Sequence, residues 1–156
     1  MKKQLYNYIK NKITMKDYNL FLDDVRVPYL TDMELKQIPV GHKHMASAYY
    51  YTDFEPFKTE QWEVVTNYDE FVSFIEKNGC PSFVAFDHDL ADEHYDYELD
   101  TNTYKEKTGY DAAKWLCEYC QDNQIKFPKY VVHSMNLVGT ENITKYIENY
   151  KKYIEN

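Results

Sequence analysis

Asp87, His88 and Asp89 are three chemically capable side chains in a row, and they follow directly on the apolar run 83–86. An apolar run this short, between Pro81 and an acidic stretch, favours a strand that is buried on both faces. In an open parallel sheet, the carboxyl end of a strand faces the ligand crevice. Two carboxylates and an imidazole at that position predict a functional site, although a strand that merely continues into an acidic loop would show the same pattern.

Two other short apolar runs also end on polar side chains. Leu-Phe-Leu leads into Asp23 and Asp24, and Tyr-Val-Val leads into His133 and Ser134. The segment 63–66 reads as one further strand. If the sheet has the flavodoxin-like order 2-1-3-4, the three strands with polar ends are neighbours, about 5 Å apart. Their polar ends must then converge.

Amphipathic helical patterns alternate with these strands. Asn67, with Glu70 three residues later, has the logic of a capping box and predicts a helix start. Further helices are expected from about Tyr110 to Asp122 and from about Thr140 onward. This alternation predicts an α/β three-layer, flavodoxin-like fold, with a mostly parallel four-stranded sheet and helices on both of its faces. No fifth strand is evident.

A length of 156 residues suits a single domain. We expect residues 1–17 to be an appendage compatible with a short helix, ahead of one domain over 18–156, with Met15 as an alternative start. Two long connections, 29–61 and 91–108, interrupt the alternation. The first is rich in aromatic residues, which favours an ordered flap beside the site. The second is acidic and could supply metal ligands, but such loops are more often simply solvated.

Composition restricts the partners. A net charge of −8 and a pI near 5.1 argue against general electrostatic attraction to nucleic acid or to anionic membranes. No apolar run approaches the roughly 18 residues of a membrane span, and the N-terminus lacks the apolar core of a signal peptide. The sequence therefore predicts a cytoplasmic protein. Cys80, Cys117 and Cys120 favour packing over metal or redox roles, and His42 and His44 favour a solvated loop over a metal site.

Three carboxylates at converging strand ends repel one another unless a hard cation lies between them. Asp23, Asp24 and Asp87 therefore predict a divalent metal site, with Mg²⁺ as the natural occupant and Mn²⁺ as an alternative. His88 and His133 would flank that ion.

Further polar groups suit an anionic ligand beside this metal. Ser134, Asn136 and backbone N–H groups at the start of the last helix could hold a phosphate oxygen. Arg26 is a candidate phosphate clamp, but a salt bridge to Asp89 or to the acidic loop is an alternative for its side chain.

The same residues resemble a known family. Asp23-Asp24, Asp87 and Ser134 look like the acidic pocket, the phosphoacceptor and the hydroxyl of response-regulator receiver domains. Receivers also carry a lysine after a fifth strand, for which this sequence shows no counterpart. The longer pattern is closer to that of the receiver-derived cyclic-phosphate processing receiver domains, and it comprises residues 22–28, 86–90, 108–109, 132–136 and 139–143.

This resemblance covers about residues 18–150 and implies a role in processing cyclic phosphates. We therefore expect a metal-assisted phosphoesterase that acts on a cyclic phosphodiester. Its substrate would be a 2′,3′-cyclic phosphate end of RNA or a small cyclic nucleotide.

Each expected site residue has a role in this reaction. The catalytic set is His88, His133 and Asp87, in which one histidine is general base and the other general acid, because an imidazole pKa near neutrality suits both directions of proton transfer. The metal ligands are Asp23, Asp24 and Asp87. The substrate-binding set is Arg26, Asp89, Ser134 and Asn136.

Two other functions stay open at this point. A binding module would sequester a nucleotide signal without turnover, with aromatic residues of segment 49–57 stacking on the base. A phosphoacceptor signalling domain would be modified on Asp87, but the missing lysine makes this the weaker alternative. The oligomeric state is not predicted by the sequence.

Overall fold

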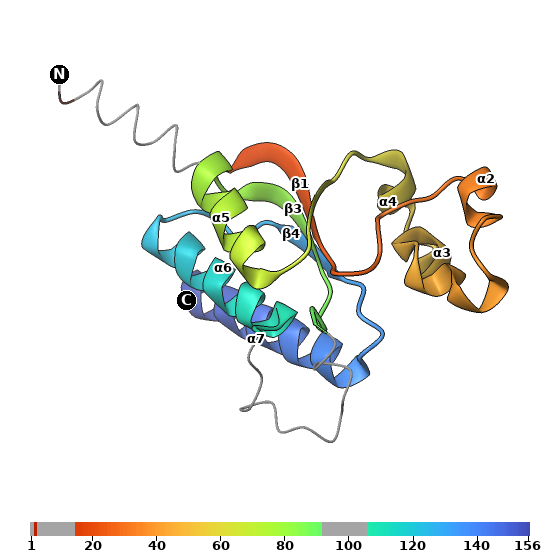
Figure 1. Cartoon of the computed structure of the whole chain (residues 1–156). Helices are drawn as coiled ribbons and strands as arrows, with labels where there is room; N and C mark the ends of the chain where they lie inside the picture. Colours follow the sequence, from red (N-terminus) through yellow and green to blue (C-terminus); the bar gives the residue numbers. More distant parts are fainter. Residues whose placement is uncertain (1, 3–14, 92–105) are drawn as a thin grey trace.

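The computed structural model describes residues 2, 15–91 and 106–156. Within them, parallel strands form one four-stranded sheet in the order β2-β1-β3-β4 (Figure 1). The predicted fold class and strand order are therefore confirmed. The strands are β1 (Lys16–Leu22), β2 (Glu63–Val65), β3 (Pro81–Phe86) and β4 (Lys129–Val132).

Strand β1 is longer than the apolar run that predicted it. It begins at Lys16, whose backbone N–H donates to the carbonyl of Cys80 at 2.7 Å. Its register with β3 shifts between Lys16 and Asn19, and only its last three residues are fully buried. Backbone hydrogen bonds hold the polar first half in the sheet, so hydrophobicity alone could not reveal it.

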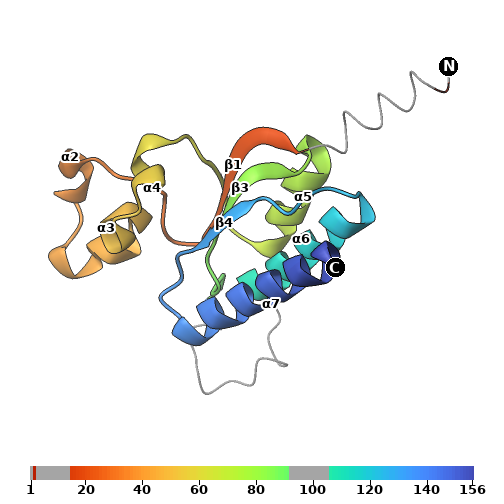
Figure 2. The same ribbon diagram turned by 180° about the vertical axis from the view of Figure 1, so that it is seen from behind.

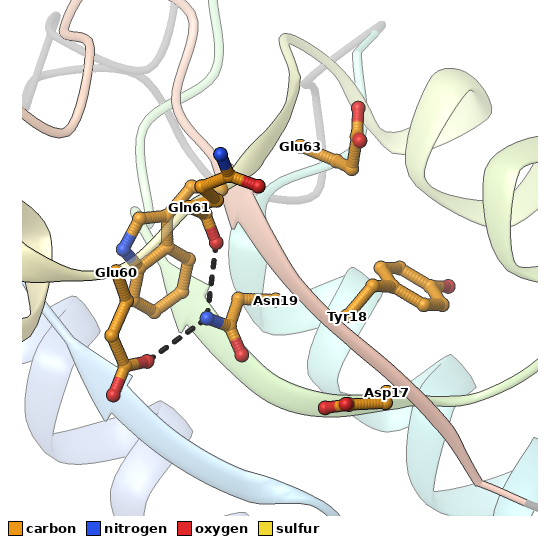
Figure 3. A pocket seen from close by; sticks show the side chains of 7 residues that line it. Asp17, Tyr18, Asn19, Glu60, Gln61 and Glu63 are labelled. Carbon is orange, nitrogen blue, oxygen red and sulfur yellow. Dashed lines mark hydrogen bonds between the residues drawn. The ribbon is translucent and has the colours of Figure 1, made fainter.

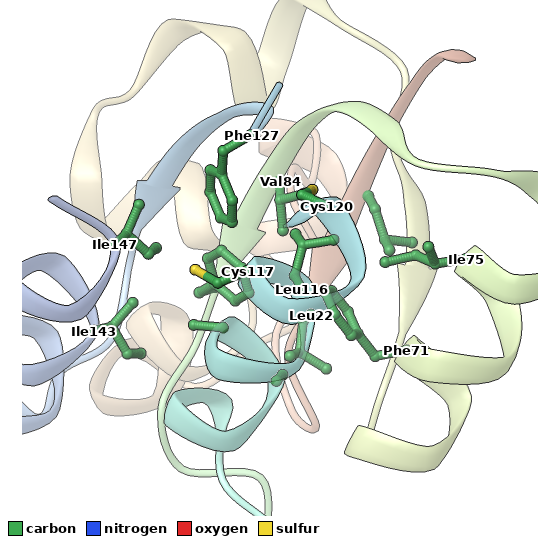
Figure 4. Close-up of a cluster of buried hydrophobic side chains, with 14 of the residues drawn as sticks. Leu22, Phe71, Ile75, Val84, Leu116, Cys117, Cys120, Phe127, Ile143 and Ile147 are labelled. Atoms are coloured by element: carbon green, nitrogen blue, oxygen red, sulfur yellow. The ribbon is translucent and has the colours of Figure 1, made fainter. Parts of the chain in front are cut away.

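Three helices cover one face of the sheet (Figures 1 and 2): α5 (Tyr68–Asn78), α6 (Gly109–Asp122) and α7 (Leu137–Glu155). Even-numbered residues of β1, β3 and β4 point toward them, as does Val65 of β2, because successive side chains alternate across a strand. The larger hydrophobic core lies between these helices and the sheet. Figure 4 shows part of it, including Leu22, Phe71, Val84, Leu116, Ile143 and Ile147.

Side-chain caps set the helix starts. The Asn67 carboxamide accepts from the N–H of Glu70 at 2.9 Å, as predicted. Helix α7 begins at Leu137, a turn earlier than the predicted start near Thr140. The reason is that Asn136 Oδ1 accepts a backbone N–H three residues on, at 2.9 Å, and so caps the helix there.

Segment 29–61 replaces the single crossover helix that would be expected here, and its second half packs on the opposite face of the sheet. Its first elements lie away from the strands (Figure 2). Phe57 packs edge-on against Phe21 of β1 at 5.5 Å, and Ala48 belongs to the same smaller core. The segment is ordered, but it forms a layer of the fold rather than a flap confined to the crevice. Its elements are α2 (Asp32–Leu35), the 3₁₀ helix η1 (Val40–Met45), α3 (Ala48–Thr52) and α4 (Glu55–Thr59).

Cys80 and Cys120 are buried in the larger core with their Sγ atoms 3.8 Å apart, which suits the predicted packing role. In the described part of the chain, His42 and His44 belong to no group of three metal-ligand side chains. No helix among the described residues has the length and apolarity to cross a membrane. The predicted appendage 1–17 and loop 91–108 lie largely outside the described residues.

We predict that Phe57→Ala destabilises the protein by about 3–5 kcal/mol, the usual cost of emptying a buried aromatic site. The Phe57 side chain is 1% exposed, whereas Met33 in the same segment is 77% exposed. Met33→Ala is therefore the matched control and should change stability by less than about 0.5 kcal/mol. Urea unfolding measures both. Equally small effects would mean that the segment is not an integral layer.

Candidate active site

Three carboxylates meet at the carboxyl ends of β1 and β3. Asp23, Asp24 and Asp87 each offer one oxygen, and these oxygens lie within 4.8 Å of one another. The register that pairs Leu22 with Phe86 brings the residues after the two strands side by side. The N–H of Asp87 extends this ladder by donating to the carbonyl of Leu22 at 2.9 Å. The acids therefore converge as the strand order required.

The Asp23 carboxylate is fully enclosed and fully hydrogen-bonded. Its Oδ1 accepts the backbone N–H groups of Val25 and Arg26 at 2.9 and 2.8 Å. Its Oδ2 accepts Arg26 Nε at 2.9 Å and His133 Nε2 at 3.0 Å. Burial by itself would raise the pKa of Asp23, but the His133 hydrogen bond and the Arg26 charge outweigh burial and hold this pKa below its usual value. Asp23 is therefore ionised, and its hydrogen bonds hold it in place.

The buried carboxylate of Asp87 has far fewer hydrogen bonds to compensate its charge than that of Asp23. Its Oδ1 accepts the N–H of His88 at 2.8 Å. Its Oδ2 is buried 3.5 Å from Arg26 Nη2, and it accepts no hydrogen bond from the described residues. Burial, and then the negative charge of Asp23, raise the pKa of Asp87 to about 7, against the lowering effect of Arg26. An orphaned carboxylate oxygen beside two other acids is a suitable ligand for a hard cation.

Arg26 lies inside the site as an internal cation. It is only 4% exposed and its guanidinium contacts both Asp23 and Asp87. A single guanidinium beside three carboxylates leaves the cluster with excess acid. Salt bridges of Arg26 to Asp23 and Asp87 are therefore present, and most of the acidic loop named as an alternative partner lies outside the described residues.

The His133 ring is enclosed and does not line the crevice, in contrast to its expected place beside a phosphate. Its side chain is 0% exposed, and it stacks on Phe21 at 4.5 Å with the edge of Phe57 at 5.5 Å. Nε2 donates to the Asp23 carboxylate, and Nδ1 has no hydrogen-bond partner among the described residues. Burial lowers the pKa of His133 below its usual value. A neutral imidazole that holds Asp23 in place fits these contacts.

His88 lies on the other side of the strand ends, against α7. Its side chain is 12% exposed, and its Nδ1 lies 2.8 Å from Asp89 Oδ1. Asn136 Nδ2 donates to the same Asp89 oxygen at 3.3 Å. A carboxylate oxygen accepts, so the Nδ1 N–H of His88 donates to Asp89, and Nε2 is the ring nitrogen outside this contact. His88, Asp89 and Asn136 therefore form an oriented imidazole of the kind that general acid–base catalysis uses.

Ser134 belongs to the same strand end as His133. Its hydroxyl oxygen accepts the N–H of Asn136 at 3.1 Å and it is 7% exposed. The Ser134 hydroxyl also helps to lower the pKa of Asp87. Ser134 thus lies beside the acid cluster, whereas the Asn136 side chain is engaged with Asp89 and with the helix cap.

Two glycines shape the site, and the sequence reading assigned no role to them. A Cβ on Gly109 would lie 1.7 Å from the carbonyl oxygen of Asp87, and one on Gly139 would lie 2.4 Å from Cγ of His88. The N–H of Gly109 also donates to the carbonyl of His88 at 2.8 Å. Both glycines lie within the family pattern, in its segments 108–109 and 139–143, and that was the sequence signal for them. Both let a helix approach the strand end closely.

A separate polar pocket of about 450 Å³ lies near the other ends of β1 and β2 (Figure 3). Asp17, Asn19, Glu60 and Trp62 are among its lining residues, and Asn19 Nδ2 donates to Glu60 Oε2 at 2.9 Å. These residues lie at the start of the strands and the acid cluster follows their ends. The pocket is therefore distinct from the candidate active site.

We predict that Gly139→Ala destabilises the protein by about 1–3 kcal/mol, because the added methyl group overpacks the His88 ring. The sign of the change in unfolding free energy is informative, because Gly→Ala at an unobstructed helix position is stabilising by about 1 kcal/mol. Gly41→Ala is the control, because a Cβ there meets nothing within 4 Å. In a His88→Ala background the penalty should shrink because the ring is gone, but part of it should remain because Cβ of residue 88 would still lie 2.8 Å from the added methyl group. A stabilising effect of Gly139→Ala in the wild type would contradict the packing described here.

The model of one family, the cyclic-phosphate processing receiver domain, matches residues 18–149. No curated protein and no solved structure matches the chain significantly. The matched range includes β2, β3 and β4, all of β1 except its first two residues, and the whole candidate active site. Because the match extends over far more than half of the sequence, the chain belongs to the cyclic-phosphate processing receiver domain family.

Proposed function

We propose that this protein is a metal-assisted phosphoesterase that opens a cyclic phosphodiester. The substrate would be a 2′,3′-cyclic phosphate end of RNA or a small cyclic nucleotide, in a cytoplasmic setting. One observation carries the proposal: the orphaned oxygen of Asp87 lies in a cluster of acids, and the next residue, His88, is an imidazole oriented by Asp89. The family's link to cyclic-phosphate processing gives this arrangement its substrate class.

Asp24 and Asp87 are the proposed direct ligands of a divalent cation, Mg²⁺ or Mn²⁺. Asp23 is less suited to direct ligation, since its two oxygens already accept four hydrogen bonds. Asp24 is partly exposed and the Asp87 oxygen is orphaned, so these two carboxylates fit a hard cation. Such a cation would screen the charge of the phosphate and lower the pKa of a bound water.

His88 is the proposed proton-transfer group. With Nδ1 held by Asp89, its Nε2 can take a proton from water as the water oxygen bonds to phosphorus. The bond from phosphorus to one ring oxygen breaks, and that oxygen takes a proton to become a hydroxyl. The product is a phosphomonoester, one water heavier than the cyclic substrate.

Two further groups have supporting roles in this proposal. His133 positions the Asp23 carboxylate and does not exchange protons with substrate, because its ring is enclosed by Phe21 and Phe57. Ser134 and the first backbone N–H groups of α7, a 19-residue helix, would receive a phosphate oxygen, since helix N-termini favour anions.

A binding module without turnover is the second candidate. The enclosure of His133 favours it, because it removes one of the two histidines expected to exchange protons. Incubation with nucleoside 2′,3′-cyclic phosphates, 3′,5′-cyclic nucleotides and cyclic-phosphate-ended RNA in Mg²⁺, followed by mass analysis, distinguishes the two. Gain of one water supports the enzyme, and tight binding without any mass change supports the module. A phosphate adduct on Asp87 would instead indicate a signalling receiver.

We predict that Mg²⁺ and Mn²⁺ bind at one site that depends on Asp24 and Asp87. Asp24→Asn and Asp87→Asn should each weaken the metal affinity by about tenfold or more, because a hard cation responds to the number of charged ligands. Asp69→Asn, on the exposed first turn of α5, is the control and should leave it unchanged. Isothermal titration calorimetry measures all four proteins. Absence of binding to the wild type would leave the acids as a structural cluster compensated by Arg26.

We predict different outcomes for the two histidines. His88→Ala should lower turnover by about 10²- to 10⁴-fold with little change in the unfolding midpoint. His133→Gln should retain turnover within about tenfold, because a glutamine N–H can still donate to Asp23. Steady-state kinetics and thermal unfolding of both variants test this. A loss in folded His133→Gln as large as that in His88→Ala would restore the two-histidine mechanism expected from the sequence.

A further inference from the structure

We propose that Tyr51 is a stacking platform for a nucleobase, so that the cyclic phosphate processed here is carried by a nucleoside. This inference rests on the proposed function, whose candidate substrates are nucleotides, and adds the residue that binds the base. It assigns recognition to a single aromatic side chain at the edge of the acid cluster.

The position of Tyr51 is set by Arg26. The Arg26 guanidinium carbon lies 5.7 Å from the centroid of the Tyr51 ring, and the same guanidinium contacts Asp23 and Asp87. The ring is therefore one side chain removed from the carboxylates, a separation comparable to that of base and phosphate within a nucleotide. Tyr51 is 41% exposed, so part of the ring faces solvent.

Helix α3 holds this ring at a defined place. Ser47 forms a β-bridge with Val27 just beyond the acid cluster, and the N–H of Ala48 donates to the carbonyl of Val27 at 3.0 Å. Ala48 is fully buried in the core on that face of the sheet. A platform that is ordered before binding loses little conformational entropy when a base stacks on it.

Other aromatic residues of the segment are already engaged or placed differently. Tyr49 packs edge-on against Tyr29, and its hydroxyl donates to Glu55 at 3.0 Å. Phe57 and Phe54 pack against each other in the core beneath the sheet. Figure 1 shows α3 next to α4, which carries Phe57.

Tyr50 provides a matched comparison. It is 48% exposed, as accessible as Tyr51, and it precedes Tyr51 in the same helix. Among the contacts of the described residues, Arg26 packs on the ring of Tyr51 and not on that of Tyr50. Exposure alone would not distinguish the two tyrosines, but proximity to the acid cluster does.

Stacking suits the electrostatics of this protein. With a net charge of −8, the chain lacks a general attraction for nucleotides. An aromatic face binds any base through its π surface and adds affinity without basic residues. A cyclic phosphate without a base would contact only the groups proposed to bind the phosphate, so Tyr51 should contribute selectively to nucleotide substrates.

The test compares two substrates that share a five-membered cyclic phosphate: adenosine 2′,3′-cyclic phosphate and glycerol 1,2-cyclic phosphate. Steady-state kinetics of the full chain in Mg²⁺ give kcat/KM for each. Tyr51→Ala should lower kcat/KM for the adenosine substrate by about 5- to 150-fold, the usual effect of losing one stacked base. It should leave kcat/KM for the glycerol substrate within about twofold, and Tyr51→Phe should behave as wild type.

Tyr50→Ala is the control and should leave both substrates unchanged. Equal loss on both substrates in Tyr51→Ala would show that the tyrosine acts through Arg26, and it would overturn the stacking proposal. No loss on either substrate would overturn it as well. If neither substrate is hydrolysed by wild type, the proposed enzyme function fails separately. Calorimetric binding of the adenosine compound to wild type and Tyr51→Ala then decides the stacking question alone.

Discussion

The buried carboxylate of Asp23 is the interaction on which the site depends. A buried charge is tolerated only when its hydrogen-bonding capacity is satisfied, and here two backbone N–H groups, Arg26 and His133 satisfy it. These contacts join the end of β1, the turn after it and the end of β4. Removing any one donor would leave a buried charge without a hydrogen-bond partner. The hydrogen bonds that keep Asp23 ionised therefore also fix the strand ends relative to one another.

Asp23 accepts hydrogen bonds from all of these donors, whereas one oxygen of the buried Asp87 carboxylate accepts none from the described residues. The two carboxylates are comparably buried, but their pKa values move in opposite directions: Asp23 is lowered by its donors, and Asp87 is raised to about 7 by burial and by the charge of Asp23. Arg26 is shared between them and holds Asp23 at the shorter distance. Neighbouring acids with pKa values pushed apart are typical of functional sites. Asp87 is therefore the carboxylate whose charge is poorly compensated, and it lies next to the oriented His88.

The two histidines show how the face of a strand decides chemistry. Both follow a buried strand, but His133 shares the parity of Val131 and points to the face covered by segment 29–61, where Phe21 and Phe57 enclose it. His88 lies on the opposite side, against the start of α7, where Gly139 leaves room for its ring. The irregular layer that replaces a crossover helix therefore has a direct effect on the site, because it turns one histidine into a structural donor.

The sequence by itself determined the α/β fold, the strand order and the convergence of the acids, because short apolar runs and their polar endings are local patterns that a parallel sheet brings together. Side-chain alternation within β4 also contained the information that His133 faces away from His88. Only the tertiary structure decided which segment covers that face. It also decided that Asp87 shares the guanidinium of Arg26 with Asp23. Phe57 reaches His133, and Tyr51 reaches Arg26, through contacts between residues far apart in the chain. Such contacts depend on how irregular segments pack, and hydrophobic periodicity does not encode that packing.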